Sequence, residues 1–543
     1  MKRFDVDIAV IGASLGGVLA AWRACEAGRR VLLTSEFDWI GGQLTAQGVP
    51  PDEHRLIEYG GASESYLAFR RAMRGLYLAN PDFVNNTEMT EGVNPGDGWV
   101  TRLCIEPIHA LHYLQHLLAP YMASGRLTLL TGTRLESVVR VGRMIESVIV
   151  TNGADEKVAI AASYFLDATD TGALIAAAQL PYRLGKEARA EFGERDAPLV
   201  ANRLDQQPCT MVVALALGET PRPPIMRPAA YDFWRDHQVP HYGYRLFSNF
   251  IPGPELGKSV ALPFFGSGQT LDLWRYRRVV SARNWRTRVE EVSLINWAQN
   301  DYALLPLLDG PVAEDGVVLA ARELTASLVH WLHTHAPHND GGDGAGDGRA
   351  TGFPQLRFSS ETLASPAAFP GQAQQVYVRE SRRVVGLDCL TQNDILADAS
   401  TGGISEPFHA ANSVGLAWYN MDIHPTCVSG HGVNAKVRPF TLPLGCFIPR
   451  DCDNLIPACK NISVTHLVNA STRTHPTEWL GGEVAALLAD FALRSNQPLV
   501  DIHRSATLAG NFQQHLIAAG IPVRWESSLT DRLRTVAVNS LEI

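Results

Sequence analysis

The opening segment of the chain, DVDIAVIGASLGGVLAAWRACEAGRRVLLTSE over residues 5–36, constrains the fold more than any other stretch. An apolar run ends at Ile11, as in an interior parallel strand, and a glycine-rich turn follows it directly. An Ala- and Leu-rich stretch then stops at Gly28, a residue suited to the left-handed conformation that ends a helix. With a second apolar run at 31–34, the order predicts a strand, a turn, a helix and a strand.

The glycine turn, Gly12-Ala13-Ser14-Leu15-Gly16-Gly17, lies where such a unit binds phosphate. Gly12 permits the tight turn, the small Ser14 lets the backbone approach a pyrophosphate, and Gly17 lets the helix pack close to the strand. The helix N-terminus then faces the negative charge. Glu36, just after the second strand, is our candidate for binding the ribose hydroxyls. The segment therefore predicts a flavin or nicotinamide dinucleotide; the alternative is a βαβ unit without a nucleotide.

Composition limits the class of protein. With 543 residues and 46% hydrophobic content, the chain can bury a large core and divide into two or three domains. A net charge of -9 with scattered Lys and Arg argues against nucleic acid and favours a small-molecule substrate. The eight cysteines form no CxxC pair and no zinc spacing, so we expect reduced thiols in the cytoplasm and no metal. No stretch is apolar enough to span a membrane; a homodimer is compatible with the sequence.

Patterns in the rest of the chain predict how it divides into domains. Residues 127–150 alternate apolar and polar around Gly142, as in a small β-meander, and 164–172 form a buried strand that suits a return to the first sheet. We predict a cofactor domain from 1–184 and a return segment at 376–500, a substrate domain at 185–375, and a peripheral helix and tail at 501–543. The glycine-rich residues 339–348 predict a surface loop, with a mobile lid as the alternative.

Several ordered segments between Val10 and Phe491 resemble a known family. They are the glycine turn, DWIGGQLTAQGVPPDEH (38–54), FLDATDTG (165–172), SLINWAQNDY (293–302), YVRESRR (377–383) and STRTHPTEWLGGEVAALLADF (471–491). Together they resemble the FAD-dependent oxidoreductases of the glutathione reductase-like flavoprotein superfamily. The resemblance implies an α/β fold: a Rossmann-like FAD-binding domain with a parallel sheet and β-meander, plus a second, mixed α+β substrate domain. It also implies FAD as cofactor, which we expect to be bound non-covalently.

The resemblance further implies which residues contact FAD. Gly12, Ser14, Gly16 and Gly17 would hold the pyrophosphate, and Glu36 would lie near the adenosine ribose. The other implied contacts are Gly41, Gly42, Gln43 and Thr45 along the ribityl chain and flavin edge, Ala168, Thr169 and Gly172 on the adenosine side, and Trp479, Gly481 and Gly482 at the pyrimidine end. A helix N-terminus at that end would stabilise the negative charge that reduced flavin carries near N1 and O2.

Candidate catalytic residues lie in three polar segments. His424, in the loop-like stretch Asp422-Ile423-His424-Pro425, is our first choice for an acid or base, because histidine titrates near neutral pH. The alternative is a loop held by side-chain hydrogen bonds. Arg473 and His475 precede the helix expected at the flavin, where Arg473 pairs either with a carboxylate or the reduced flavin, or in a structural ion pair. Arg382 belongs either to a substrate-anion clamp at 379–383 or to a salt-bridge network.

These features predict a FAD-dependent oxidoreductase that dehydrogenates a small polar metabolite by hydride transfer to flavin N5. The absence of a second glycine turn and of a redox CxxC disfavours a dithiol reductase. Two alternatives stay open: a fumarate reductase-like reductase of a C=C or C=O bond, in which arginines 379, 382 and 383 donate a proton or clamp a carboxylate, and a flavin-binding electron-relay protein.

Overall fold

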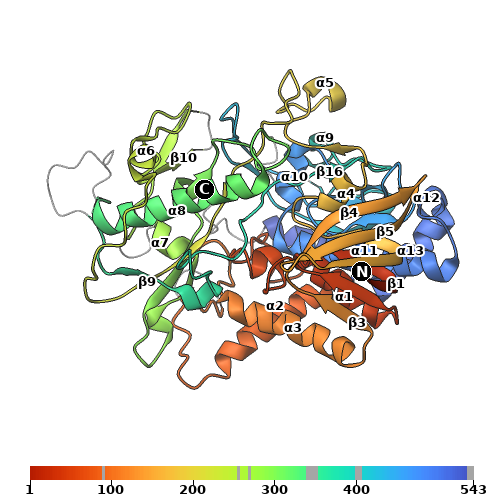
Figure 1. Cartoon of the computed structure of the whole chain (residues 1–543), viewed down its shortest axis with the longest axis horizontal. Helices are drawn as coiled ribbons and strands as arrows, with labels where there is room; N and C mark the ends of the chain where they lie inside the picture. Colours follow the sequence, from red (N-terminus) through yellow and green to blue (C-terminus); the bar gives the residue numbers. More distant parts are fainter. Residues whose placement is uncertain (88–91, 254–256, 267–270, 338–351, 398–405, 535–543) are drawn as a thin grey trace.

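A computed structural model describes residues 1–543 except 88–91, 254–256, 267–270, 338–351, 398–405 and 535–543. The loop predicted at 339–348 therefore lies outside the described residues. A large mixed sheet that contains the N-terminal strand lies on one side of the molecule, and a second, smaller sheet with a long helix lies on the other side (Figure 1).

The large sheet confirms the predicted Rossmann-like arrangement. Its strands, in spatial order, are β3 (Leu127–Leu130), β2 (Val31–Thr34), β1 (Lys2–Ile11), β6 (Lys157–Asp167), β5 (Met144–Asn152) and β4 (Thr133–Val141). The pairs from β3 to β6 are parallel, whereas β6, β5 and β4 form an antiparallel meander. Strand β21 (Leu455–Pro457) adds to β6 in parallel, so a segment far downstream in the chain completes the first sheet.

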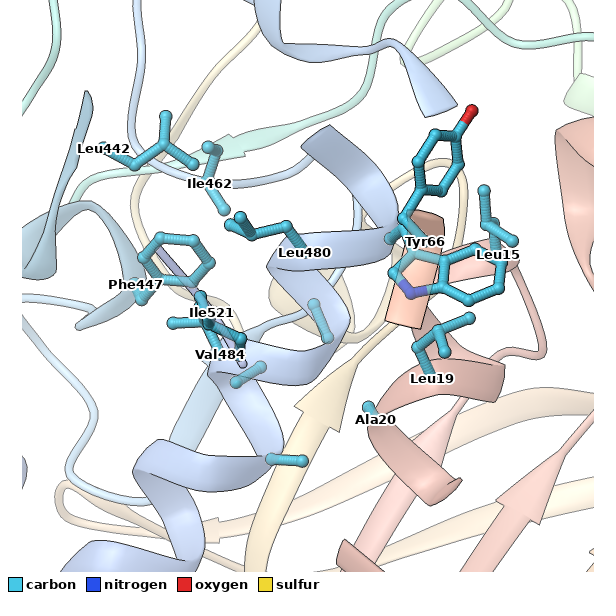
Figure 2. Packing of buried hydrophobic residues seen from close by; sticks show 14 of the residues in the cluster. Leu15, Leu19, Ala20, Tyr66, Leu442, Phe447, Ile462, Leu480, Val484 and Ile521 are labelled. Carbon is cyan, nitrogen blue, oxygen red and sulfur yellow. The ribbon is translucent and has the colours of Figure 1, made fainter. Parts of the chain in front are cut away.

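Two helices cross at glycine over this sheet. Helix α1 (Leu15–Glu26) follows the glycine turn, and α11 (His475–Ser495) packs across it. A Cβ built on Gly16 would lie 1.9 Å from the carbonyl oxygen of Ala458, and one on Gly482 would lie 2.0 Å from that of Gly16. Figure 2 shows the apolar side chains that flank this crossing: Leu15 and Leu19 on α1, Leu480 and Val484 on α11, and Tyr66 from α2 (Glu64–Leu78). Glycine at both positions therefore permits the close approach of α1 and α11.

The second sheet is antiparallel and is built from residues 213–358. Its order is β12 (Arg278–Val280), β13 (Glu291–Ile295), β9 (Val213–Leu217) and β15 (Leu356–Phe358), and β8 (Cys209–Thr210) pairs with β14 (Asp301–Tyr302) beside it. Helix α8 (Glu314–Thr334) packs on the apolar core of this part (Figure 1). Its shorter elements are α6 (Tyr231–Asp236), β10 (Phe250–Pro252), β11 (Ser259–Ala261) and α7 (Leu273–Tyr276), whereas α5 (Arg189–Phe192) lies outside this part, next to Asn393 (Figure 1).

The chain then returns to the first sheet through short paired strands. These are β16 (Arg383–Val384) with β7 (Tyr182–Arg183), β17 (Ser413–Ala417) with β20 (Phe440–Pro443), and β18 (Met421–Ile423) with β19 (Val433–Ala435). The remaining helices are α3 (Pro107–Ala123), α4 (Ala173–Ala177), α9 (Gln392–Ile395), α10 (His466–Thr472), α12 (Leu499–Arg504), α13 (Ala506–Ala518) and α14 (Ser527–Thr530). Among the described residues, no helix is both long and apolar enough to cross a membrane.

Candidate functional site

The glycine turn joins β1 to α1 as the sequence predicts. Gly12 has a φ of +98°, in the left-handed region, and its N–H donates to Thr34 Oγ1 over 3.0 Å. Ser14 caps α1, because its Oγ accepts the N–H of Gly17 at 3.2 Å. A Cβ on Gly17 would lie 2.1 Å from the carbonyl oxygen of Gly12, so only glycine fits between helix and strand. The N-terminus of a 12-residue helix thus opens beside a turn in which backbone can approach a ligand.

The glycine pair after β2 folds back on this turn. Gly41 and Gly42 both have positive φ, and Gly41 N–H donates to the carbonyl oxygen of Ala13 at 2.8 Å. A Cβ on Gly42 would approach the Cα of Ser14 to 3.0 Å. The amide of Gln47 in the same loop is fully buried, and neither its nitrogen nor its oxygen has a hydrogen-bond partner in the described part of the chain. A buried amide of this kind needs a polar partner, which a bound ligand or an ordered water supplies.

A buried charge cluster lies behind the turn. Lys460, which is 1% exposed, pairs with Asp170 and lies 3.3 Å from Glu478 Oε2. The other carboxylate oxygen of Glu478 accepts the N–H of Gly16 at 3.2 Å. Oxygen and sulfur atoms of Asp170, Cys459 and Glu478 lie within 4.8 Å of one another, and the Lys460 ammonium is the cation that the structure places among them. This cluster ties β21 and α11 to the start of α1.

The other predicted cofactor residues lie either in the loops that follow β2 and β6 or in the core of the protein. Ala168 and Thr169 follow β6 beside the turn, since Ala168 N–H donates to the carbonyl oxygen of Ile11. Gly172 caps α4 with a left-handed backbone against Arg382. Thr45 Oγ1 donates to the carbonyl oxygen of Ile40, and Glu36 pairs with Arg134 at 2.5 Å near the end of β2.

Trp479 and Gly481 lie in the core of the protein. The Trp479 indole packs against Tyr66 and Phe69 of α2 and donates to Ser65 Oγ, and a Cβ on Gly481 would lie 3.8 Å from Phe447. In this arrangement the α11 residues that reach the glycine turn are Gly482 and Glu478.

His424 is held between two carboxylates. Its Nδ1 lies 2.5 Å from Asp301 Oδ2, and its Nε2 lies 3.4 Å from Asp422 Oδ2. Asp301 in turn accepts from Arg379 at 2.9 Å and from Thr210. The short contact at Nδ1 assigns a proton to that nitrogen, while Nε2 faces Asp422 Oδ2. The His424 side chain is 25% exposed, which leaves it accessible to a ligand.

The two carboxylates shift the protonation of His424. Burial and the charge of Arg379 act to lower the pKa of His424, but Asp301 and Asp422 outweigh them, so this pKa lies above its ordinary value. Burial acts to raise the pKa of Asp301, whereas Arg379 and His424 hold it at about 2. Both aspartates, whose pKa values are lowered, thus stay ionised around a histidine whose pKa is raised.

The loop that carries His424 is held in place by Lys186 and Asp205. Lys186 Nζ donates to Thr426 Oγ1 and Ser429 Oγ, both at 2.9 Å, and lies 3.0 Å from Asp205. Asp205 accepts two backbone N–H groups of the same loop, from Val428 and Ser429. These contacts set the position of His424 without involving its ring.

Arg473 links this histidine to the glycine-pair loop. Its carbonyl oxygen accepts Gln43 Nε2 at 3.1 Å, while its guanidinium donates to the Tyr377 hydroxyl and to Asp422 Oδ2 at 3.2 Å. Gln43 also donates to Glu478 at 2.6 Å. The predicted cofactor loop and the His424 region are therefore one continuous hydrogen-bonded site.

His475, the second histidine candidate, is bound to the main chain on both sides. Its Nδ1 accepts the N–H of Asp52 at 2.9 Å, and its Nε2 donates to the carbonyl oxygen of Val49 at 3.1 Å. It is fully buried, and burial lowers its pKa to about 4. No ring nitrogen is left for a substrate.

Arg382 lies apart from His424. It pairs with Asp309 at 2.7 Å and with Glu314 at 2.9 Å and donates to the carbonyl oxygen of Thr171, so it joins the start of α8 to the loop after β6. Its neighbour Arg383 is buried between Glu187 and Glu380. Within the run 379–383, the arginine that reaches the His424 region is Arg379.

Sequence reasoning missed two cations of this site. Lys460 follows β21 in the stretch Pro457-Ala458-Cys459-Lys460, which matches no motif of known chemistry. Arg277 precedes β12 and lies 3.4 Å from Asp52 Oδ1. Strong burial of a lysine or arginine is visible only after folding, because Asp52 lies 225 residues from Arg277 and Asp170 lies 290 residues from Lys460 in the chain.

The strand order, the glycine turn and the loop that packs on it define a dinucleotide-binding protein of Rossmann-like fold. A family model described as FAD dependent oxidoreductase matches residues 7–516. The chain belongs to this family, and it is a FAD-dependent oxidoreductase enzyme whose cofactor is FAD. The left-handed glycines at 12, 41 and 42 and the unpartnered Gln47 amide fit that cofactor.

Other similarities are weak or local. Thiamine thiazole synthase of Aeropyrum pernix is 43% identical over 47 residues, which are 9% of this chain and 17% of that enzyme. A geranylgeranyl bacteriochlorophyll reductase-like protein from Thermoplasma acidophilum is 11% identical with a TM-score of 0.30, covering 100% of this chain and 93% of that one. L-Proline dehydrogenase from P. horikoshii is 17% identical with a TM-score of 0.18, covering 31% and 23%. At these TM-scores the solved structures add no argument about the substrate of this chain.

Proposed function

We propose that the enzyme dehydrogenates a small polar metabolite, with His424 Nε2 as the base that takes the proton from a substrate hydroxyl or amino group. The observation that carries the proposal is the contact of His424 with Asp301, which holds a proton on Nδ1, so that Nε2, 3.4 Å from Asp422 Oδ2, is the nitrogen that would exchange a proton with the substrate. FAD, bound non-covalently, supplies the two-electron acceptor of the reaction.

The residues around His424 support its role as the base. The imidazolium that forms on proton transfer would be stabilised by Asp301 and Asp422. Arg473 connects the site to the cofactor loop through Gln43, so a substrate at His424 would lie beside the cofactor loop. We assign His475 a structural role, because both of its ring nitrogens are bound to the main chain.

A second candidate function, reduction of a C=C or C=O bond, draws support from the raised pKa of His424. Despite burial and Arg379, both of which act to lower this pKa, Asp301 and Asp422 keep the ring protonated to higher pH. A protonated imidazole donates a proton rather than accepting one. In this direction the rate would fall with pH, whereas dehydrogenation would become faster as His424 loses its proton.

An anaerobic titration tests the proposal. The FAD-loaded enzyme is mixed with a panel of hydroxy and amino compounds while the absorption of oxidised flavin is recorded, and a chemically reduced sample is mixed with keto and unsaturated acids. Bleaching by a hydroxy or amino compound is the expected result. Reoxidation of the reduced flavin by an unsaturated or keto acid, without any bleaching by the first panel, would contradict dehydrogenation and support the reductase function. No response to either panel, in enzyme that dithionite reduces, would favour an electron-relay protein.

A further inference from the structure

We propose that Arg277 and Arg473 bind a carboxylate of the substrate, so that the compound oxidised is a small hydroxy acid or amino acid. This inference rests on the proposed function and names its substrate class. It stands on two buried guanidinium groups whose hydrogen-bonding capacity the protein itself leaves partly unused.

Arg277 is the less satisfied of the two. It is 8% exposed, and its guanidinium reaches Asp52 at 3.4 Å, a long contact for an ion pair. Its Nε has no hydrogen-bond partner within the described residues. The neighbouring Arg278 differs, because it donates to Glu291 at 2.8 Å and to the carbonyl oxygens of Gly96 and Asp97. A buried guanidinium with unused donors is costly, and a ligand carboxylate would satisfy it.

Arg473 lies near the same tyrosine side chains as Arg277. Its Nε also has no partner in the described part of the chain, and its other nitrogens bond Tyr377 and Asp422. Tyr377 and Tyr419 interact electrostatically with both arginines. Asp52, the partner of Arg277, donates its N–H to His475 two residues after Arg473, so the two arginines belong to one cluster, and Asp422 connects Arg473 to His424 Nε2.

Charge balance favours an anionic ligand. The site contains as many aspartates as arginines: Asp52, Asp301 and Asp422 against Arg277, Arg379 and Arg473. Protonation of His424 adds one positive charge that these groups do not cancel. A substrate carboxylate would supply the missing negative charge at the moment the base becomes an imidazolium.

The chemistry balances for a hydroxy acid. The O–H and C–H bonds of the alcohol carbon break and a C=O bond forms. The hydroxyl proton goes to His424 Nε2, and the C–H hydrogen leaves with its electron pair to the flavin oxidant of the proposed function. For an amino acid the same steps give an imine. The carboxylate does not react; it orients the carbon that does.

Calorimetric titration of the holoenzyme with oxalate and with its uncharged analogue oxamide tests the anion site. We expect saturable binding of oxalate only, weakened at least tenfold in Arg277→Gln and less in Arg277→Lys, which keeps a cation for Asp52. Arg278→Gln is the matched control from the adjacent position and should bind oxalate as the wild type does. Circular dichroism and FAD content verify that each variant is folded.

Two results would overturn this inference: equal binding of oxalate and oxamide, or wild-type affinity for oxalate in Arg277→Gln. Either can occur while a metabolite still bleaches the flavin, in which case the proposed function stands. Conversely, oxalate binding that depends on Arg277, combined with no bleaching by any metabolite, would support the anion site and contradict dehydrogenation.

Discussion

The glycine turn and the His424 region are built in opposite ways. The turn is formed by six consecutive residues whose backbone conformation shapes the site, and its neighbours are held by close backbone contacts at Gly16 and Gly482. The His424 region is assembled from β14, β18 and the residue after α10, with side chains that balance one another's charge. The comparison shows why the cofactor can be predicted from the sequence whereas the substrate cannot.

The largest effect is expected at the turn. Gly16→Ala places a methyl group 1.9 Å from the carbonyl oxygen of Ala458, so α1 must move away from β21 and α11. We expect a loss of about 3 kcal/mol in the free energy of unfolding and protein that is purified with little FAD. Thermal unfolding and the absorbance of bound flavin measure both.

Gly75→Ala is the matched control for that variant. Gly75 lies within α2, and a Cβ there meets no atom within 4 Å. It should leave FAD content unchanged and raise stability by up to about 1 kcal/mol. Equal losses in the two variants would show that backbone packing at the turn is not what holds the cofactor domain together.

The two histidines should differ in catalysis. His424→Gln removes the proposed base, and we expect flavin reduction by substrate to slow about 10²- to 10⁴-fold with FAD still bound. His475→Gln should keep a rate close to that of the wild type, because the His475 nitrogens bond Asp52 and Val49 rather than a ligand. Anaerobic stopped-flow absorbance measures both rates. A larger loss in His475→Gln than in His424→Gln would reverse our assignment.

The stability of the protein at acidic pH should depend on His475. Burial lowers its pKa to about 4, so the unfolded chain takes up a proton near pH 6.5 that the folded protein refuses. Stability is therefore complete above pH 6.5 and falls as the pH drops towards 4, by at most about 1.4 kcal/mol per pH unit for one group. Urea unfolding measured across this pH range should show that the free energy of unfolding falls less steeply with decreasing pH in His475→Gln than in the wild type. His54, whose pKa burial also lowers to about 4, accounts for part of the slope that remains.

The smallest effect is expected at Glu36, where the predicted ribose contact is partly open to solvent. Its side chain is 40% exposed and pairs with Arg134 on β4. Glu36→Gln should weaken FAD binding by about 1 kcal/mol or less, roughly fivefold, without changing substrate-dependent rates. Fluorescence titration of the apoprotein with FAD measures the affinity. An unchanged affinity would remove Glu36 from the cofactor site.

The sequence predicts those parts of the fold that depend on local order. Strand, turn, helix and strand around Gly12 follow from residues adjacent in the chain, as does the meander around Gly142. The joining of β21 to β6 and the crossing of α1 with α11 bring together residues that are hundreds of positions apart. The sequence predicts that residues 376–500 return to the cofactor domain, but it predicts neither of these two contacts.

For the site, the sequence identifies residue types but not their surroundings. His424 and His475 both lie near acidic residues in the chain, yet one is paired with Asp301 from β14 and the other with main chain near Asp52. Arg277 and Lys460 carry no motif, because burial and the distance to a carboxylate are properties of the folded protein. Such residues become visible only when separated segments meet.

The most direct test of the account is the pH dependence of flavin reduction by substrate in the wild type and in Asp422→Asn. Asp422 helps raise the pKa of His424, so removing its charge lowers that pKa. We predict a rate that rises with pH as His424 loses its proton, and the same rise displaced to lower pH in Asp422→Asn. A rate that falls with increasing pH, or identical profiles in the two proteins, would contradict the assignment of His424 as the base.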